Sequence, residues 1–206
     1  RKKREFLRQR FFQQINRVRM ENLRSRISPH FTFNVLGREI NQFNGSEEVK
    51  HNLMELVKYL RRSLELTEKL SVSLQDELDF VRTYIELERG RVGEDFVATI
   101  TVEDGLDATR IMIPSMIVQI PVENAIKHGL AGKDGKKELM VYVSRETNGI
   151  RITVTDNGRG YLPQVVSATR GTGTGLKVLY QTIQLLNTKN KSDKIRFNIT
   201  NRSDGQ

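Results

Sequence analysis

Apolar residues recur every three to five positions along the first 43 residues, which predicts one long helix. The apolar seam is coiled-coil-like, with one polar interruption, and consists of Leu7, Phe11, Ile15, Val18, Asn22 and Ile27. Pro29 falls inside this pattern. Because proline lacks a backbone N–H, we expect a kink just before it. Beyond the kink, an apolar face resumes at Phe31 and continues to Ile40.

A second helix is predicted after the short turn at residues 44–46, with Ser46 as its N-cap. Its wide apolar stripe consists of Val49, Leu53, Leu56, Val57, Leu60 and Leu64. Two helices joined by a tight turn form an antiparallel hairpin. Two such hairpins would bury both stripes in a four-helix bundle, so we expect a homodimer.

The pattern becomes mixed in the second half of the chain. Ser73 has the position of an N-cap for a third helix that extends to about Glu88. The following segments are predicted as strands at 96–103, 139–145, 150–156 and 195–200 and as helices at 114–128 and 174–187. Intermixed strands and helices favour an α/β sandwich with helices on one face of a single sheet. The predicted fold class is therefore α+β, a dimerising helical hairpin followed by this sandwich.

Composition places the chain among globular proteins, with 37% hydrophobic and 29% charged residues in a length of 206. It contains no cysteine, which excludes disulfides and thiolate metal sites. The net charge is +9, and residues 1–28 alone carry ten Lys or Arg against two Glu. Such a basic arm suits either nucleic acid or the cytoplasmic end of a membrane helix. No apolar run approaches the roughly 20 residues that span a bilayer, so any membrane segment would lie upstream.

His30 is the first residue with candidate chemistry. It follows the expected kink at Pro29, and a neutral imidazole nitrogen is a good nucleophile toward phosphorus. Asn34 lies one helical turn further on, within reach to orient the ring. Taken alone, however, a surface histidine beside a kink is the commoner interpretation.

Residues 123–128 form the second candidate block. Asn124, Lys127 and His128 lie at i, i+3 and i+4 of a predicted helix, so we expect them to share a face. An amide oxygen, an ammonium group and an imidazole together suit a magnesium-bound triphosphate. Glu123 would point elsewhere and could position a water or the metal. The alternative is an ordinary polar helix face.

Two glycine-containing turns complete the candidate chemistry. Asp156 begins the sequence Asp-Asn-Gly-Arg-Gly at a strand end, which is either a simple turn or a carboxylate that accepts a hydrogen bond from an adenine amino group. Residues 171–176 read Gly-Thr-Gly-Thr-Gly-Leu before a helix, which is either a flexible loop or a phosphate-binding turn. This second turn matches neither the P-loop nor the dinucleotide fingerprint. Residues 161–173 are expected to form a short mobile lid over the nucleotide.

In this order, the four blocks resemble those of LytS-like sensor histidine kinases. The acceptor block reads Arg-Ile-Ser-Pro-His-Phe-Thr-Phe-Asn and ends at Asn34, and the resemblance covers roughly residues 22–200. It implies that the ATP-binding half has the GHKL (Bergerat) fold of gyrase, Hsp90, histidine kinases and MutL. The implied domains are a juxtamembrane helix at 1–20, a dimerisation and phosphotransfer hairpin at 21–70 and a catalytic ATP-binding domain at 71–206.

The resemblance also implies roles for individual residues. His30 would be the phosphoacceptor, with Asn34 and Glu123 as further catalytic residues, and Asn124 would bind Mg²⁺. The implied ATP-binding residues are Asn124, Lys127, His128, Asp156, Gly158, Gly160, Gly171, Gly173, Gly175 and Leu176.

The implied function is that of a sensor histidine kinase that autophosphorylates from ATP and passes the phosphate to an aspartate of a response-regulator receiver domain. The expected partners are a second copy of the chain and that receiver domain, with no nucleic acid. The full-length protein is expected at the cytoplasmic face of the inner membrane through an upstream sensor segment, and this fragment is expected to be soluble. One alternative is a degenerate kinase that acts as a nucleotide-binding signalling module, because Val178 stands where the family usually has asparagine. Another is a nucleic-acid-associated ATPase, motivated by the charge of +9.

Overall fold

The computed structural model describes Ile40 and residues 45–160, 174–189 and 194–201. The chain divides into two compact units, Arg1–Leu70 and Ser71–Gln206. None of the described helices is both long and apolar enough to cross a membrane.

The described part of the first unit is mainly the helix α3, Glu47–Glu68. Its predicted cap is confirmed, because the Ser46 hydroxyl accepts a hydrogen bond from the Val49 N–H at 3.3 Å. Two positions of the predicted apolar stripe differ in burial, since Val57 is buried and Leu56 is exposed. The first helix of the expected hairpin lies outside the described residues apart from Ile40, and dimerisation stays a prediction.

The second unit begins with a short strand and a capped helix. The strand β1 (Ser71–Ser73) pairs antiparallel with β3 (Met112–Pro114). The helix α4 (Leu74–Val92) follows directly, and its predicted cap is confirmed because the Ser73 hydroxyl accepts from the Asp76 N–H at 3.0 Å. The helix runs a turn beyond the predicted end and stops at Gly93, whose φ of 113° favours glycine.

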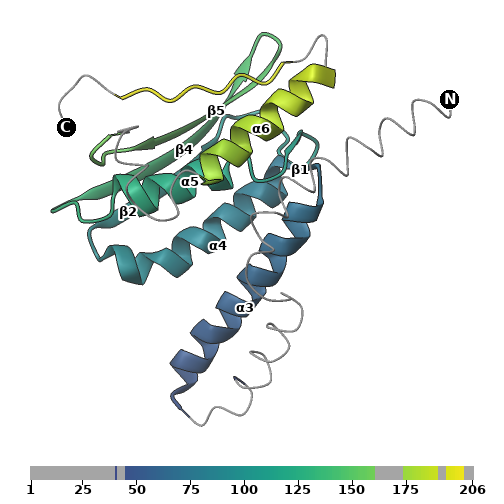
Figure 1. The fold of residues 1–206 in the computed structure, drawn as a ribbon. Coiled ribbons are helices and arrows are strands. Elements are labelled where there is room, and N and C mark those ends of the chain that lie inside the picture. The colour runs from purple at the N-terminus through teal and green to yellow at the C-terminus, as the bar shows by residue number, and fades with distance from the viewer. Residues whose placement is uncertain (1–39, 41–44, 161–173, 190–193, 202–206) are drawn as a thin grey trace. The chain divides into compact units, whose positions relative to one another are not determined.

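A three-stranded sheet forms the main layer of this unit. It has the order β2 (Phe96–Val102), β4 (Lys137–Glu146) and β5 (Gly149–Asp156). The strands β2 and β4 are parallel, whereas β4 and β5 form an antiparallel hairpin. Side chains alternate along β4, so that Leu139 is buried and Met140 is exposed. Figure 1 shows α4, α5 and α6 gathered on one face of the sheet, as the predicted sandwich requires.

The helix α5 (Gln119–Asn124) continues into a π-helical turn, η1 (Ala125–Gly129), which the Leu130 N–H closes on the Ala125 carbonyl at 2.8 Å. This is shorter than the helix predicted for 114–128. The predicted helix cannot begin at 114 because Met116 has a φ of 67°, in the left-handed region.

The helix α6 (Thr174–Lys189) packs against the extended segment 194–201. The Asn187 amide both donates to the Ile195 carbonyl and accepts from the Ile195 N–H, each at 2.8 Å, and the Tyr180 and Phe197 rings meet edge to face. The predicted strand 195–200 is therefore extended, but within the described residues it belongs to neither sheet. Its contacts with α6, rather than strand pairing, hold it in place.

Candidate functional site

The helical segment 119–129 presents two residues to a pocket. Asn124 and His128, four positions apart, both line it. The Asn124 amide nitrogen donates to the Ile120 carbonyl at 2.8 Å. This bond fixes the side chain and leaves its oxygen as the atom that can meet a cation or a phosphate-bound water.

Lys127 and Glu123 lie on a different side of the same segment. The Lys127 ammonium pairs with the Glu123 carboxylate at 2.9 Å and lies 5.8 Å from the Tyr84 ring centroid on α4. Neither residue lines the pocket. The structure thus differs from the expected shared face of Asn124, Lys127 and His128. The physical reason is the competing carboxylate at i−4 of the lysine, together with the wider π-helical turn, which does not keep the 3.6-residue period.

Asp156 ends β5 at the opposite wall of the pocket. Its carboxylate is half-buried, and Oδ1 accepts a hydrogen bond from the Gly158 N–H at 2.9 Å. The next residue, Asn157, extends the strand pairing with its side chain, which accepts from the Glu138 N–H at 2.8 Å and donates to the Lys136 carbonyl at 3.0 Å. The turn after β5 is therefore fixed on both sides, and the second carboxylate oxygen of Asp156 is left for another donor.

Two glycines let the helix end and this turn touch. A Cβ atom at Gly129 would lie 2.4 Å from Asp156 Oδ1, and one at Gly158 would lie 2.2 Å from the Gly129 carbonyl oxygen. The Arg159 N–H also donates to that carbonyl at 3.2 Å. Gly129 was not among the residues predicted to form the site, although its place directly after His128 was the available signal. The close approach brings the Asn124 and Asp156 blocks together.

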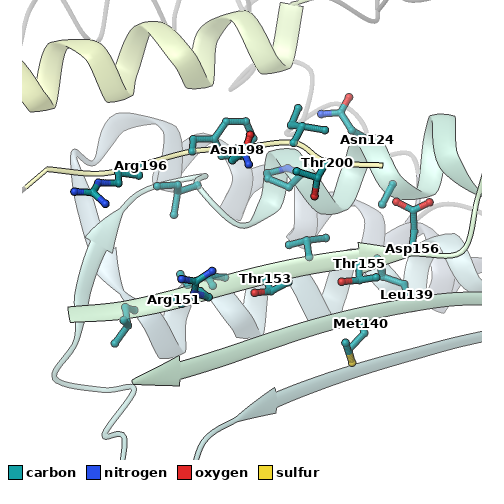
Figure 2. Close-up of a pocket in the computed structure, with 18 of the residues that line it drawn as sticks. Asn124, Leu139, Met140, Arg151, Thr153, Thr155, Asp156, Arg196, Asn198 and Thr200 are labelled. Carbon is teal, nitrogen blue, oxygen red and sulfur yellow. The ribbon is translucent and has the colours of Figure 1, made fainter. Parts of the chain in front are cut away.

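The pocket is lined by residues of α5, η1, β5 and the turn after it, the start of α6, and the extended segment 194–201 (Figure 2). Its lining includes Asn124, His128, Gly129, Asp156, Gly158, Gly160 and Leu176. Of the predicted ATP-binding residues that the structure describes, Lys127 and Gly175 do not line it, and Gly175 lies beside Ile120. Sequence reasoning missed the opposite rim, where Arg196, Asn198 and Thr200 face β5. His30, Asn34, Gly171 and Gly173, together with the expected lid at 161–173, lie outside the described residues.

Burial sets the charges in the pocket. It raises the pKa of Asp156 above the ordinary value, and the Gly158 N–H opposes the rise. Burial also lowers the pKa of His128, and the neighbouring Lys127 ammonium adds to that effect. The wall formed by Asn124 and His128 is therefore neutral near physiological pH, because the imidazole holds no extra proton there.

The residues of this pocket would suit a magnesium ion that is bound together with a nucleotide. Among the described residues, no cluster of three His, Cys, Asp or Glu side chains could hold a metal by itself. Mg²⁺ in nucleotide sites is bound by one or two protein oxygens plus phosphates and waters. The fixed Asn124 side chain, with its oxygen available at the pocket wall, suits that arrangement.

Comparison with known proteins matches both halves of the chain to protein families. Residues 18–96 match a family model described as histidine kinase, and residues 111–204 match one described as histidine kinase-, DNA gyrase B- and HSP90-like ATPase.

Two curated relatives carry names of the same kind. The sensor histidine kinase YpdA of Escherichia coli K12 is 29% identical over 83% of this chain and 31% of its own length. The sensor histidine kinase/phosphatase LytS of Staphylococcus aureus MRSA252 is 32% identical over 88% of this chain and 32% of its own length. The chain thus spans about a third of the length of the curated relatives it matches.

Among solved structures, the histidine kinase domain of the Erythrobacter litoralis EL346 blue-light activated histidine kinase is similar with a TM-score of 0.44 and 14% identity. This likeness covers 84% of this chain and 83% of that domain. The assignment itself rests on the two family matches and the curated relatives. The predicted α+β class with a GHKL-type ATPase domain is confirmed, and the chain belongs to the LytS-like sensor histidine kinases.

Proposed function

We propose that the chain is the kinase core of a two-component sensor, which binds ATP and transfers its γ-phosphate to His30. The observation that carries this proposal is the meeting of two sequence blocks at one pocket. Asn124 and His128 come from the helical segment, Asp156 ends β5, and Gly129 and Gly158 allow the two to touch. An ATPase fold with a nucleophilic histidine in the preceding unit is the arrangement that a histidine kinase needs.

In the proposed reaction, a lone pair on an imidazole nitrogen of His30 forms a bond to the γ-phosphorus of ATP. The bond between that phosphorus and the β,γ-bridging oxygen breaks, ADP leaves with the electron pair, and the imidazole releases a proton to water. A carboxylate oxygen of a receiver-domain aspartate then forms a bond to the phosphorus, and the phosphorus–nitrogen bond breaks with its electron pair returning to the imidazole of His30. Such transfers depend mainly on positioning and charge neutralisation.

Different pocket residues would contact the adenine, the magnesium ion and the phosphates. Asp156 would accept a hydrogen bond from the adenine amino group through Oδ2, because the Gly158 N–H already donates to Oδ1. Asn124 would hold Mg²⁺, which neutralises the phosphate charge, and His128 would donate to a phosphate oxygen as a neutral imidazole. Glu123 would position a water near the metal. Lys127 would reach the phosphates only after its ammonium leaves the Glu123 carboxylate, to which it is now paired.

The proposal extends to the parts of the protein beyond this pocket. Residues 1–20 would form a juxtamembrane helix, residues 21–70 the dimerising hairpin that carries His30 and Asn34, and residues 71–206 the catalytic domain. Gly171, Gly173 and Gly175 would form the lid hinge and the phosphate loop. The partners would be a second copy of the chain and a receiver domain, at the cytoplasmic face of a membrane.

The test is phosphorylation with γ-³²P-labelled ATP and magnesium. The wild-type chain should acquire an acid-labile label, the lability expected of a phosphorus–nitrogen bond. His30→Gln should remove the label while leaving nucleotide affinity unchanged, because the substitution leaves the pocket residues Asn124, His128 and Asp156 intact. His51→Gln is the matched control, since His51 is an exposed histidine of α3.

Two outcomes would contradict the proposal. Undiminished labelling of the His30→Gln chain would refute the acceptor assignment. Nucleotide binding by the wild-type chain without any labelling, even with the sensor held in its active state, would favour the degenerate kinase that signals by nucleotide binding alone.

A further inference from the structure

Glu77 on α4 is a charged side chain that the proposed reaction does not use. It is fully buried, with 0% of its surface exposed. Its carboxylate accepts three backbone hydrogen bonds: Oε2 from the Met116 N–H at 3.0 Å, and Oε1 from the N–H groups of Val118 at 3.1 Å and Gln119 at 3.2 Å. Met116 and Val118 precede α5, and Gln119 is its first residue.

This carboxylate takes the place of a local helix cap. The first N–H groups of a helix have no partner within the helix and are usually satisfied by a nearby Ser, Thr, Asp or Asn. In α5 the cap position is Val118, which makes no side-chain cap bond. Glu77 supplies the acceptors from 41 and 42 positions earlier in the chain. Without these bonds, the three N–H groups would be left without an acceptor at a helix start that α4 covers, which is costly.

The same carboxylate also holds a strained turn. Met116 has a φ of 67°, and left-handed backbone is costly for a residue with a side chain. Its N–H is one of the three donors to Glu77. The turn therefore keeps its shape because a buried acceptor lies at its centre.

The helix start is linked to the pocket by the segment that follows. Gln119, whose backbone is bound by Glu77, donates from its side chain to Glu123 at 3.0 Å, and Glu123 binds Lys127 at 2.9 Å. The side chains of Gln119, Glu123 and Lys127 thus lie on one side of the segment, whereas Asn124 and His128 line the pocket from another side. Fixing the start of the segment thus fixes which side chains face the pocket.

From this geometry we infer that Glu77 is a positioning residue for the magnesium and phosphate half of the nucleotide site. The inference rests on the proposed function, because it assigns the site that Asn124 and His128 would form. The adenine half touches the far end of the segment at Gly129 but also has hydrogen bonds that do not involve Glu77. Asp156 is bound by the Gly158 N–H, and Asn157 fixes the same turn to Lys136 and Glu138. Loss of the Glu77 carboxylate should therefore affect the two halves unequally.

The experiment compares two ligands on the whole chain. Binding of ATP with magnesium is measured by calorimetry, and binding of adenosine by NMR shift titration. Glu77→Gln replaces one acceptor oxygen with an amide NH₂ that faces backbone donors. We expect it to weaken Mg-ATP binding about tenfold, the cost of one displaced hydrogen bond to a charged group, and to leave adenosine binding within about twofold. Glu86→Gln is the control, since Glu86 is exposed on the same helix and bonds Arg89.

A second variant covers the case in which Glu77→Gln does not fold. Glu77→Asp keeps the charge but is one carbon shorter, so it cannot reach all three donors, and we expect a smaller loss with the same split between ligands. A direct readout is the backbone amide resonances of Met116, Val118 and Gln119, which should move in either variant.

The outcomes separate this inference from the proposed function. Equal weakening of both ligands would show that Glu77 only stabilises the fold, and unchanged Mg-ATP binding would show that it does not position the site. Either result overturns the inference while wild-type binding stands. A wild-type chain that binds no nucleotide would refute the proposed function, and this inference with it.

Discussion

Two carboxylates lie at opposite ends of the helical segment 119–129, and they differ in how many of their acceptor positions the chain itself uses. Glu77 meets the start of the segment, is fully buried and accepts three backbone N–H groups. Asp156 meets the end at Gly129, is half-buried, lines the pocket and accepts one N–H, from Gly158. The chain itself uses the hydrogen-bonding capacity of Glu77, whereas Asp156 keeps an oxygen for a ligand.

The difference shows how a buried charge can be assigned a role. A carboxylate has about four acceptor positions, and burial is costly unless they are used. Where backbone donors use them, as at Glu77, the charge orders the chain. Where burial raises the pKa and donors are few, as at Asp156, the group is ready for a ligand that brings its own donor. Three further changes test this contrast.

The largest loss of stability is expected from Gly129→Ala, because the new side chain forces the end of the helical segment away from Asp156. The new Cβ would lie 2.4 Å from Asp156 Oδ1, so the turn or the helix must move. We expect the free energy of unfolding to fall by about 3 kcal/mol, at the upper end for an overpacked site. Thermal or denaturant unfolding measures it, and Mg-ATP and adenosine binding should both weaken, unlike in Glu77→Gln.

The matched control is Gly90→Ala on α4, where a Cβ meets nothing within 4 Å. An alanine in the body of a helix should stabilise the protein by about 0.5–1 kcal/mol. A Gly129→Ala protein as stable as the wild type would show that the contact with Asp156 is not tight, and would remove one side of the comparison.

The second effect concerns Asp156→Asn, which keeps the shape of the side chain and removes its charge. We expect adenosine and ATP to bind about thirtyfold more weakly, because a hydrogen bond to a charged group is worth about 2 kcal/mol. Asp104→Asn is the control, since Asp104 is exposed. Unchanged adenosine affinity in Asp156→Asn would refute the adenine-binding role.

The stability of the Asp156→Asn protein should rise even though its affinity for adenosine and ATP falls. Because burial raises the pKa of Asp156, the folded protein binds the acidic proton more tightly than the unfolded chain does. The contribution of Asp156 to wild-type stability therefore falls as the pH rises from its unfolded to its folded pKa, and it stays lower above that window. Asp156→Asn should be modestly more stable than the wild type at neutral pH. Its advantage should disappear in acid, as followed by melting temperature against pH.

The smallest effect on stability is expected from Lys127→Ala. Its ion pair with Glu123 is partly exposed, with 46% and 29% of the two side chains accessible, so its loss should cost about 0.5 kcal/mol. Arg82→Ala, which breaks a comparable pair with Asp79, is the control. Mg-ATP affinity decides the role of Lys127. If Lys127→Ala weakens Mg-ATP binding about tenfold more than the control does, Lys127 contacts the phosphates in the complex. If the affinity is unchanged, Lys127 stays paired with Glu123 and has no role in binding.

Much of the local structure could be predicted from the sequence. Ser46 and Ser73 were identified as helix caps because the chemistry of a cap lies within four residues. The strand 150–156 and the turn after it followed from a short run of β-forming residues that ends in Asp-Asn-Gly. The extended shape of 195–200 was likewise predictable, but its attachment to α6 through Asn187 was not. Local periodicity says nothing about which distant element a segment contacts.

By itself, then, the sequence determined the helices α3, α4 and α6, the strands β2, β4 and β5 and the family, because these depend on residues close together in the chain and on the order of the blocks. Only the tertiary structure decided which side chains share the pocket. It turned Lys127 toward Glu123, brought Gly129 against Asp156, and buried Glu77 beneath residues some forty positions away. The physical reason is that hydrogen bonds and close contacts between distant segments depend on how the elements pack, and a helical or strand period describes only one element at a time.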